Sequence, residues 1–297
     1  MYRITEKNIV LKGVIKVGQF VRKLKKAYLC TAVINESLLC KRMIVKMVDD
    51  ILRRDLERYA AMYEAEEFLQ GDPSWFMHKV EGSANQEATA FLAACLSYGS
   101  RRHFMPKIQW LLDCAEGDVD TWVREGGFEK DLPSGDTGCF YRLYTVGQMN
   151  AFLCAYKRLL LEHGTLGEYV RMRASDGLSA VEAICSYFCG AGVSGIVPQD
   201  ARSACKRVCM FLRWMVRSGS PVDLGLWADF IDRRTLIMPL DTHVLSESQR
   251  LGLLKCGSAT MSAAHRLTQK MSEIFPDDPL KGDFALFGYG VRQQDVQ

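Results

Sequence analysis

The sequence predicts an all-α protein. Apolar residues recur at helical spacing from residue 44 onward, with charged residues between them. We find no run that alternates convincingly with period two, no internal repeat and no low-complexity linker. The chain has 297 residues, 48% hydrophobic and 25% charged, an ordinary composition for one large or two ordinary globular domains. We therefore expect one helical domain or two closely apposed helical lobes.

The helices can be placed in order along the chain. The first is long, with Ile44, Met47, Ile51, Tyr59 and Tyr63 near one stripe, and Gly71-Asp72-Pro73 stops it. Further helices are predicted over residues 86–98, 101–115, 145–163, 178–189, 201–217, 242–254 and 260–274, with a short final helix after Asp283.

Charge is distributed unevenly along the chain. Residues 1–46 hold 11 Lys and Arg against Glu6 and Glu36, a net charge of +9, so the chain total of +3 leaves −6 for the other 251 residues. We expect a basic N-terminal extension over residues 1–43, for which disorder is one interpretation, and a helical domain over residues 44–297. The extension suits a nucleic-acid-binding arm or a transit-type presequence. An extension from an upstream start codon is the interpretation we prefer.

The sequence indicates a cytoplasmic protein without a membrane partner. Its longest charge-free stretches, Ala183–Gln199 and Ala88–Ser100, are too short and too often interrupted to cross a bilayer. The N-terminus lacks the apolar core and cleavage site of a secretory signal. Eleven scattered cysteines therefore indicate reduced thiols.

The predicted helix over residues 201–217 has two chemically different faces. One face is apolar, and the other carries Arg202, Lys206, Arg213 and Arg217. Four cations on one stripe repel one another unless an anion lies opposite. The stripe is either a solvated helix face, the commoner explanation, or a phosphate-facing surface on which neighbouring charge favours the neutral amine of Lys206.

A second element, Leu236–Val244, brings an apolar run to the start of a helix. Asp241 follows Pro239-Leu240 and occupies the predicted N-cap position. Capping is its simplest role. The alternative is that Asp241 projects a carboxylate into a cleft beside the preceding loop, where the helix N-terminus keeps it ionised.

These segments resemble a known superfamily, the helix-hairpin-helix DNA glycosylases. Pro239-Leu240-Asp241-Thr242-His243-Val244, followed by Arg250-Leu251-Gly252-Leu253, is similar to its V-D-T-H-V-x-R-x-x-x-R-L-G-L segment. Phe91–Ser97 resembles the early L-I-x-x-x-L-S helix before the DNA-probing loop, and Ala285–Gly290 the late A-L-x-x-x-G helix. Residues Lys206–Trp227 look like an uncharacterised bacterial branch. The resemblance covers residues 46–291 and implies two helical lobes around a cleft.

The resemblance implies DNA base excision by a glycosylase, with or without AP-lyase activity. Asp241 matches the catalytic aspartate, whose carboxylate stabilises oxocarbenium character on the sugar. Lys206 matches the lysine whose amine attacks the sugar and forms a Schiff base before strand cleavage. A monomer would flip the damaged base into the cleft.

Further residues complete the predicted site. The candidates for nucleic-acid binding are Arg202, Arg207, Arg213, Arg217, Tyr98, Ser100 and His243. Tyr98 and Ser100 occupy the stretch where relatives insert a residue into the gap left by a flipped base. Asp283, Trp214 and Trp227 are further cleft candidates, although an N-cap explains Asp283 and core packing explains the tryptophans more simply.

The sequence also departs from the family pattern, and this keeps two alternatives open. The glycine-rich hairpin turn is replaced by Gly195–Lys206, which keeps only the lysine and an upstream glycine, and Ser246 stands where the family has arginine. One alternative is a non-catalytic nucleic-acid-binding protein on the same scaffold. The other is an enzyme acting on free nucleosides or nucleotides, favoured by the net charge of −6.

No cofactor or metal is expected. The family's iron–sulfur cluster uses four cysteines after the late helix, and this sequence has no cysteine beyond Cys256. The pairs Cys185/Cys189 and Cys205/Cys209 have a spacing that suits zinc. Each pair lies in apolar sequence, and buried small side chains are the interpretation we prefer.

Overall fold

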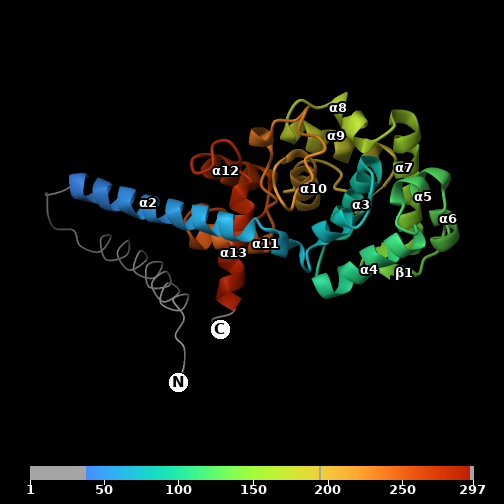
Figure 1. Ribbon diagram of the computed structural model, residues 1–297, viewed down its shortest axis with the longest axis horizontal. Coiled ribbons are helices and arrows are strands. Elements are labelled where there is room, and N and C mark those ends of the chain that lie inside the picture. The colour runs from blue at the N-terminus through green and yellow to red at the C-terminus, as the bar shows by residue number, and fades with distance from the viewer. Residues whose placement is uncertain (1–37, 194, 295–297) are drawn as a thin grey trace, which may run out of the picture. The chain divides into compact units, whose positions relative to one another are not determined.

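A computed structural model describes residues 38–193 and 195–294 of the chain (Figure 1). It divides into two units, residues 1–57 and 58–297, and the boundary falls inside helix α2 (Leu38–Tyr63). The basic extension predicted over residues 1–43 lies mostly outside the described residues. Residues 38–43 are part of α2, so the predicted domain start at residue 44 falls within a helix.

The second unit consists mainly of helices. After α2 come the 3₁₀ helices η1 (Glu66–Leu69) and η2 (Pro73–His78), then α3 (Ser83–Leu96), α4 (Arg101–Cys114), α5 (Val119–Glu125) and α6 (Phe128–Asp131), then strands β1 (Cys139–Tyr141) and β2 (Tyr144–Thr145). Helices α7 (Val146–His163), α8 (Leu166–Arg171), α9 (Gly177–Gly190) and α10 (Lys206–Val216) follow, then η3 (Arg233–Thr235), α11 (Thr242–Arg250), α12 (Met261–Ser272) and α13 (Lys281–Gln294). The all-α class is therefore confirmed.

The helical periodicity located every long helix but missed the short elements. The first helix ends at Tyr63, eight residues before Gly71, and α13 begins at Lys281, ahead of Asp283 rather than after it. Helices α5, α6 and α8 span fewer than two and a half turns, too few for a periodic apolar stripe to emerge. The antiparallel pair β1–β2, with Tyr141 opposite Tyr144, is too short to show alternation.

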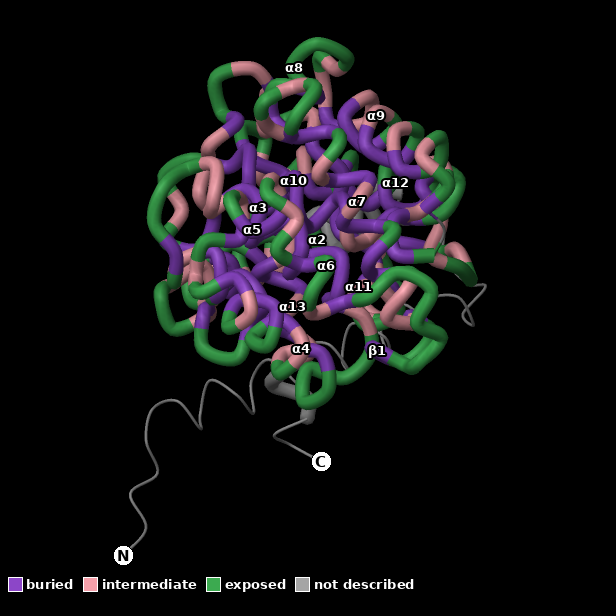
Figure 2. The backbone as a smooth tube through the Cα atoms, turned by 90° about the vertical axis from the view of Figure 1, so that its right-hand side faces the viewer, coloured by how far each residue is buried: buried purple, intermediate pink, exposed green. Residues whose placement is uncertain are grey.

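The core of the second unit surrounds α3, which packs against α10, α5 and α4. The ring of Phe91 on α3 lies 5.1–5.8 Å from the rings of Phe152, Tyr156, Phe188 and Phe211, which come from α7, α9 and α10. Figure 2 shows α3 and α10 as buried tube and the outer loops as exposed. Burying aromatic and small residues on all faces of α3 makes it the centre of the unit.

The segment before α10 is not helical, contrary to the prediction of a helix from residue 201. Ser203 forms an isolated bridge with Thr260, and the Met261 N–H donates to the Arg202 carbonyl at 3.3 Å. Cys205 adopts a left-handed backbone conformation, with φ of 44°, at the N-cap of α10. Residues 201–205 are thus paired with the start of α12, and α10 begins only at Lys206.

None of the helices within residues 38–193 and 195–294 combines the length and the apolar character needed to cross a membrane.

Candidate active site

Asp241 caps α11, as its position predicted. Its Oδ1 accepts hydrogen bonds from the backbone N–H groups of His243 and Val244, both at 2.9 Å. The residue is half-buried, and its Oδ2 makes no hydrogen bond to any residue that the structure describes. One oxygen therefore serves the helix while the other is free to act on a ligand.

Lys206, Asp241 and Asp283 share one electrostatic environment. Asp283 lies in the first turn of α13, and its side chain is only 13% exposed. Burial raises the pKa of its carboxyl, Arg213 and Lys206 lower it, and Asp241 raises it further. Asp283 also pairs with Arg213 of α10, and α11 packs against α13, so the three residues come from helices that contact one another through α13.

The environment of Lys206 differs from the prediction. Its ammonium is half-buried and contacts the Met210 sulfur at 3.4 Å. Arg202 is not on α10, and the other two cations of the predicted stripe are neutralised by carboxylates. The argument that neighbouring positive charge favours a neutral Lys206 therefore loses its premise.

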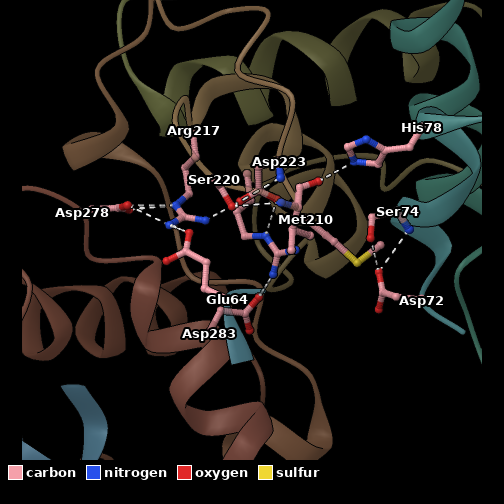
Figure 3. A network of polar contacts seen from close by, with 12 residues as sticks. Glu64, Asp72, Ser74, His78, Met210, Arg217, Ser220, Asp223, Asp278 and Asp283 are labelled. Carbon is pink, nitrogen blue, oxygen red and sulfur yellow. Dashed lines mark hydrogen bonds and ion pairs between the residues drawn. The ribbon is translucent and has the colours of Figure 1, made fainter. Parts of the chain in front are cut away.

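Arg213 and Arg217 are buried in a network of ion pairs. Figure 3 shows Arg217 with its partners Glu64, Asp223 and Asp278. Arg213 donates to Asp283 Oδ2 at 2.5 Å and to Asp223 Oδ1 at 3.2 Å. Arg217 bonds Asp278 at 2.8 Å through Nε, Glu64 at 2.6 Å through Nη2, and Asp223. The prediction that these two arginines contact nucleic acid is wrong, because burial leaves them no access to a phosphate.

The other predicted cations of this region have different surroundings. Arg207 donates to the Cys95 carbonyl and the Tyr144 hydroxyl, each at 2.7 Å, and to the Gly195 carbonyl at 3.1 Å. Arg202 is exposed and paired with Asp200 at 2.7 Å. Arg207 is thus engaged with the protein itself, whereas Arg202 remains accessible.

Trp214 and Trp227 are core residues, not cleft residues. They are 0% and 2% exposed, and the Trp227 indole donates to Glu87 Oε2 at 2.8 Å. Burial this complete confirms core packing, the simpler explanation, and rules out the alternative that they line a cleft and stack on a base.

A cationic face that sequence reasoning largely missed is formed by α4 and the β1–β2 hairpin. We define this α4–hairpin face by Tyr98, Ser100, Arg101, Arg102, His103, Lys107, Arg142 and Leu143. Leu143 at the hairpin tip is 78% exposed, and its neighbour Arg142 stacks 4.8 Å above the Tyr98 ring. Gly99 permits this stacking, because a Cβ there would lie 2.6 Å from the Arg142 guanidinium. The signal in the sequence was the turn Arg142-Leu143 between two tyrosines.

The predicted residues Tyr98, Ser100 and His243 remain accessible. Ser100 and His243 are exposed and Tyr98 is half-buried. Tyr98 and Ser100 belong to the α4–hairpin face, whereas His243 lies in the first turn of α11 beside Asp241.

The cysteines offer no metal centre in the described part of the chain, where no three His, Cys, Asp or Glu side chains cluster suitably. Cys185, Cys205 and Cys209 are buried and Cys189 is exposed.

The fold and site define a helical protein whose candidate site draws a lysine from the start of α10 and two aspartates from the cap of α11 and the first turn of α13. Residues 72–292 match the family described as "Protein of unknown function (DUF2400)", and the chain belongs to this family. No curated protein and no solved structure matches the chain significantly.

Proposed function

We propose that the protein is a DNA base-excision glycosylase on a two-lobed helix-hairpin-helix scaffold, acting as a cytoplasmic monomer. The observation that carries the proposal is the shared environment of Lys206, Asp241 and Asp283. An amine and a capped carboxylate that both act on Asp283 suit the cleavage of an N-glycosidic bond.

The chemistry follows from these groups. The neutral amine of Lys206 attacks the sugar carbon that bears the base, and the base leaves with the bonding electron pair. Asp241 Oδ2, which the helix cap does not use, stabilises the positive charge that develops on the sugar. Lys206 must first lose a proton, and Asp283 is the carboxylate in its electrostatic neighbourhood that suits this proton.

The α4–hairpin face supports nucleic acid as the partner. On α4, Arg102 and Lys107 add positive charge to this face, and Asp113 is the one acidic residue of the helix. Arg101 of the same helix is paired with Asp72 at 3.2 Å. Cations of this kind neutralise phosphates, and an exposed apolar tip flanked by an aromatic ring suits insertion between bases. We therefore assign DNA contact to this face rather than to α10.

A second candidate is an enzyme acting on a free nucleoside or nucleotide. It is favoured by the internal engagement of Arg207, Arg213 and Arg217, which removes three predicted phosphate contacts. The same lysine and aspartate would then act on a ligand without a strand. A non-catalytic DNA-binding protein is less favoured, because binding alone does not require a carboxylate such as Asp283, which is only 13% exposed and senses the charges of Lys206 and Asp241.

The test is borohydride trapping on a panel of lesion-bearing and abasic oligonucleotides. We expect a covalent adduct that Lys206→Gln abolishes and that the matched surface variant Lys270→Gln, which loses only a pair with Glu273 at 2.8 Å, retains. Asp241→Asn should keep the fold, since Asn also caps helices, and should lose base excision. Full excision by both site variants would overturn the proposal.

Salt dependence separates the candidates. Binding to a duplex should weaken steeply as salt rises from about 50 to 200 mM. An enzyme for free nucleosides should release a base from the monomer and show no measurable oligonucleotide binding.

A further inference from the structure

A cavity of about 550 Å³ opens beside the last turns of α4. Its lining comes from two segments, the residues directly after η2 and the end of α4: Lys79, Val80, Leu112, Asp113, Glu116 and Gly117. Residues 109, 112 and 113 lie on one face of the helix, whereas Lys107 and Trp110 face Phe140 of β1. The cavity therefore lies on a different side of α4 from the hairpin.

The cavity has an apolar floor and an acidic rim. Val80 and Leu112 are buried, whereas Asp113 and Glu116 are exposed. Asp113 Oδ1 accepts a hydrogen bond from the Gln109 amide at 2.7 Å. The Glu116 carboxylate has no hydrogen bond or ion pair with any residue that the structure describes. The rim therefore carries negative charge that the protein leaves without a counter-charge.

The lysine of the lining does not neutralise these acids. The Lys79 ammonium lies 3.9 Å from the centre of the Trp75 ring, in a cation–π contact, and it forms an ion pair with neither carboxylate. The Trp75 ring is itself 37% exposed. The two carboxylates are thus accessible to a cation that comes from outside the protein.

Glu116 occupies a backbone position that favours glycine. Its φ is 50°, and it ends α4 in a Schellman motif: its N–H donates to the Asp113 carbonyl at 3.1 Å, and the Gly117 N–H donates to the Leu112 carbonyl at 3.0 Å. Glycine adopts this conformation without strain. The chain therefore places a carboxylate at the rim where stability alone would select glycine.

The turn that forms this wall of the cavity is held in place by Asn85 of α3. The Asn85 amide donates to the Gly117 carbonyl at 2.8 Å, and its oxygen accepts from the Val119 N–H at 2.8 Å. A Cβ on Gly117 would meet no atom within 4 Å, so the backbone there borders open space. A wall fixed in this way lowers the cost of ordering the site when a ligand binds.

The negative charge extends beyond the cavity. Residues 113–136 contain only two cations, Arg124 and Lys130, against eight acids, which gives a net charge of −6. The acids are Asp113, Glu116, Asp118, Asp120, Glu125, Glu129, Asp131 and Asp136. A surface of this charge repels phosphates and attracts a ligand that carries several positive charges.

We propose that this cavity is the docking site for a basic segment of a protein partner. An arginine or lysine side chain of that segment lays its apolar stem on Val80 and Leu112, and its charged end meets Asp113 and Glu116. The further cations of the segment lie along residues 113–136. The partner binds on a different side of α4 from the hairpin, and the proposal does not depend on the chemistry at Lys206.

Fluorescence anisotropy of a labelled nonapeptide that alternates arginine and leucine tests the proposal on the full-length protein. We expect saturable binding that weakens as the salt concentration rises. A peptide with neutral citrulline in place of arginine should not bind. Glu116→Gln and Glu116→Gly should each weaken binding of the arginine peptide about tenfold, because each removes a hydrogen bond between charged groups.

The glycine variant separates binding from folding. Since glycine suits the φ of 50° at this position, Glu116→Gly should unfold at the same urea concentration as the parent or at a higher one. Glu182→Gln is the matched control, because Glu182 is an exposed acid of α9 outside residues 113–136, and it should bind the peptide like the parent.

Two results would overturn the proposal. One is equal affinity of the parent and both Glu116 variants for the arginine peptide. The other is complete displacement of the peptide by an equimolar amount of spermidine, which would make the site one for a free polyamine. Neither result bears on base excision, which borohydride trapping tests separately.

Discussion

The buried ion network of α10 and the α4–hairpin face both contain arginines set among apolar residues, yet their environments are opposite. Arg217 is 1% exposed and contacts three carboxylates, from Glu64, Asp223 and Asp278. Arg142 is exposed and rests on an aromatic ring. Both side chains carry the same guanidinium. That of Arg217 is engaged by carboxylates of the protein, whereas that of Arg142 is accessible to a binding partner.

The comparison shows that the partners of a charge, more than its periodicity, decide its role. Burying an ion costs several kcal/mol unless opposite charges and hydrogen bonds surround it. The acids that surround Arg217 come from segments before and after α10, at distances of up to 153 positions in the chain. A stripe of cations on one helix does not identify which distant acidic residues pair with it.

Arg217→Met gives the largest expected effect, because it leaves Asp278 buried without its cation and Asp223 with Arg213 alone. We expect the free energy of unfolding in urea to fall by about 3 to 5 kcal/mol. The exposed residue Arg102 provides the control, since Arg102→Met should change the free energy of unfolding by less than about 0.5 kcal/mol. An equal loss of unfolding free energy in the two variants would mean that the arginines of the buried network and of the α4–hairpin face do not differ in their contribution to stability.

Glu87 extends the comparison to a buried acid that no cation contacts within the described part of the chain. Its carboxylate accepts from the backbone of Leu166 at 2.8 Å and Gly167 at 3.1 Å, and from Trp227. Burial raises its pKa from 4.5 to about 7 despite these hydrogen bonds. The folded state therefore binds a proton that the unfolded state has released, in the window between the two pKa values.

The stability that Glu87 contributes therefore falls as the pH rises. The stabilisation is complete below pH 4.5 and is lost as the pH rises through about 7, a change of about 3 kcal/mol at 1.36 kcal/mol per pKa unit. Urea unfolding at pH 5 and pH 8 should show this loss in the parent and not in Glu87→Gln. A parent whose stability difference from the variant is constant over this range would contradict the assignment.

Leu143→Ala and Arg142→Ala test the accessible side of the comparison. Each should weaken duplex binding about tenfold while leaving the unfolding midpoint unchanged. Only Arg142→Ala should also lower the salt slope of binding, by about one. Leu161→Ala is the matched control, since this leucine on α7 is 64% exposed and outside the face. If Leu161→Ala weakened duplex binding as much as Leu143→Ala, the assignment of DNA contact to the α4–hairpin face would be wrong.

The smallest effect is expected for Arg202→Ala. Its guanidinium is 88% exposed and pairs only locally with Asp200, two residues away. Exposed pairs contribute little because water screens them, so the melting temperature should match that of the parent. A clear destabilisation would mean that the segment before α10 depends on this contact.

The sequence predicted what local chemistry determines. Helical periodicity located the long helices, and the cap position of Asp241 followed from the residues around it. What it could not predict depends on distant residues: the carboxylates that pair with Arg217, and the pairing of Arg213 with Asp283 on α13. The hairpin carrying Leu143 was missed because two short strands hold too little pattern.

The position of Asp278 in the chain determines when the set of three carboxylates around Arg217 is complete during protein synthesis. Asp223 follows Arg217 by six residues, but Asp278 follows by 61. At 5 to 20 residues per second the ribosome needs roughly 3 to 12 s to reach it. Ribosome-bound chains ending near residue 260 should therefore be cleaved by protease within α10, whereas released full-length chains should resist. The interior of this protein thus closes around α10 only after the last helices have been made.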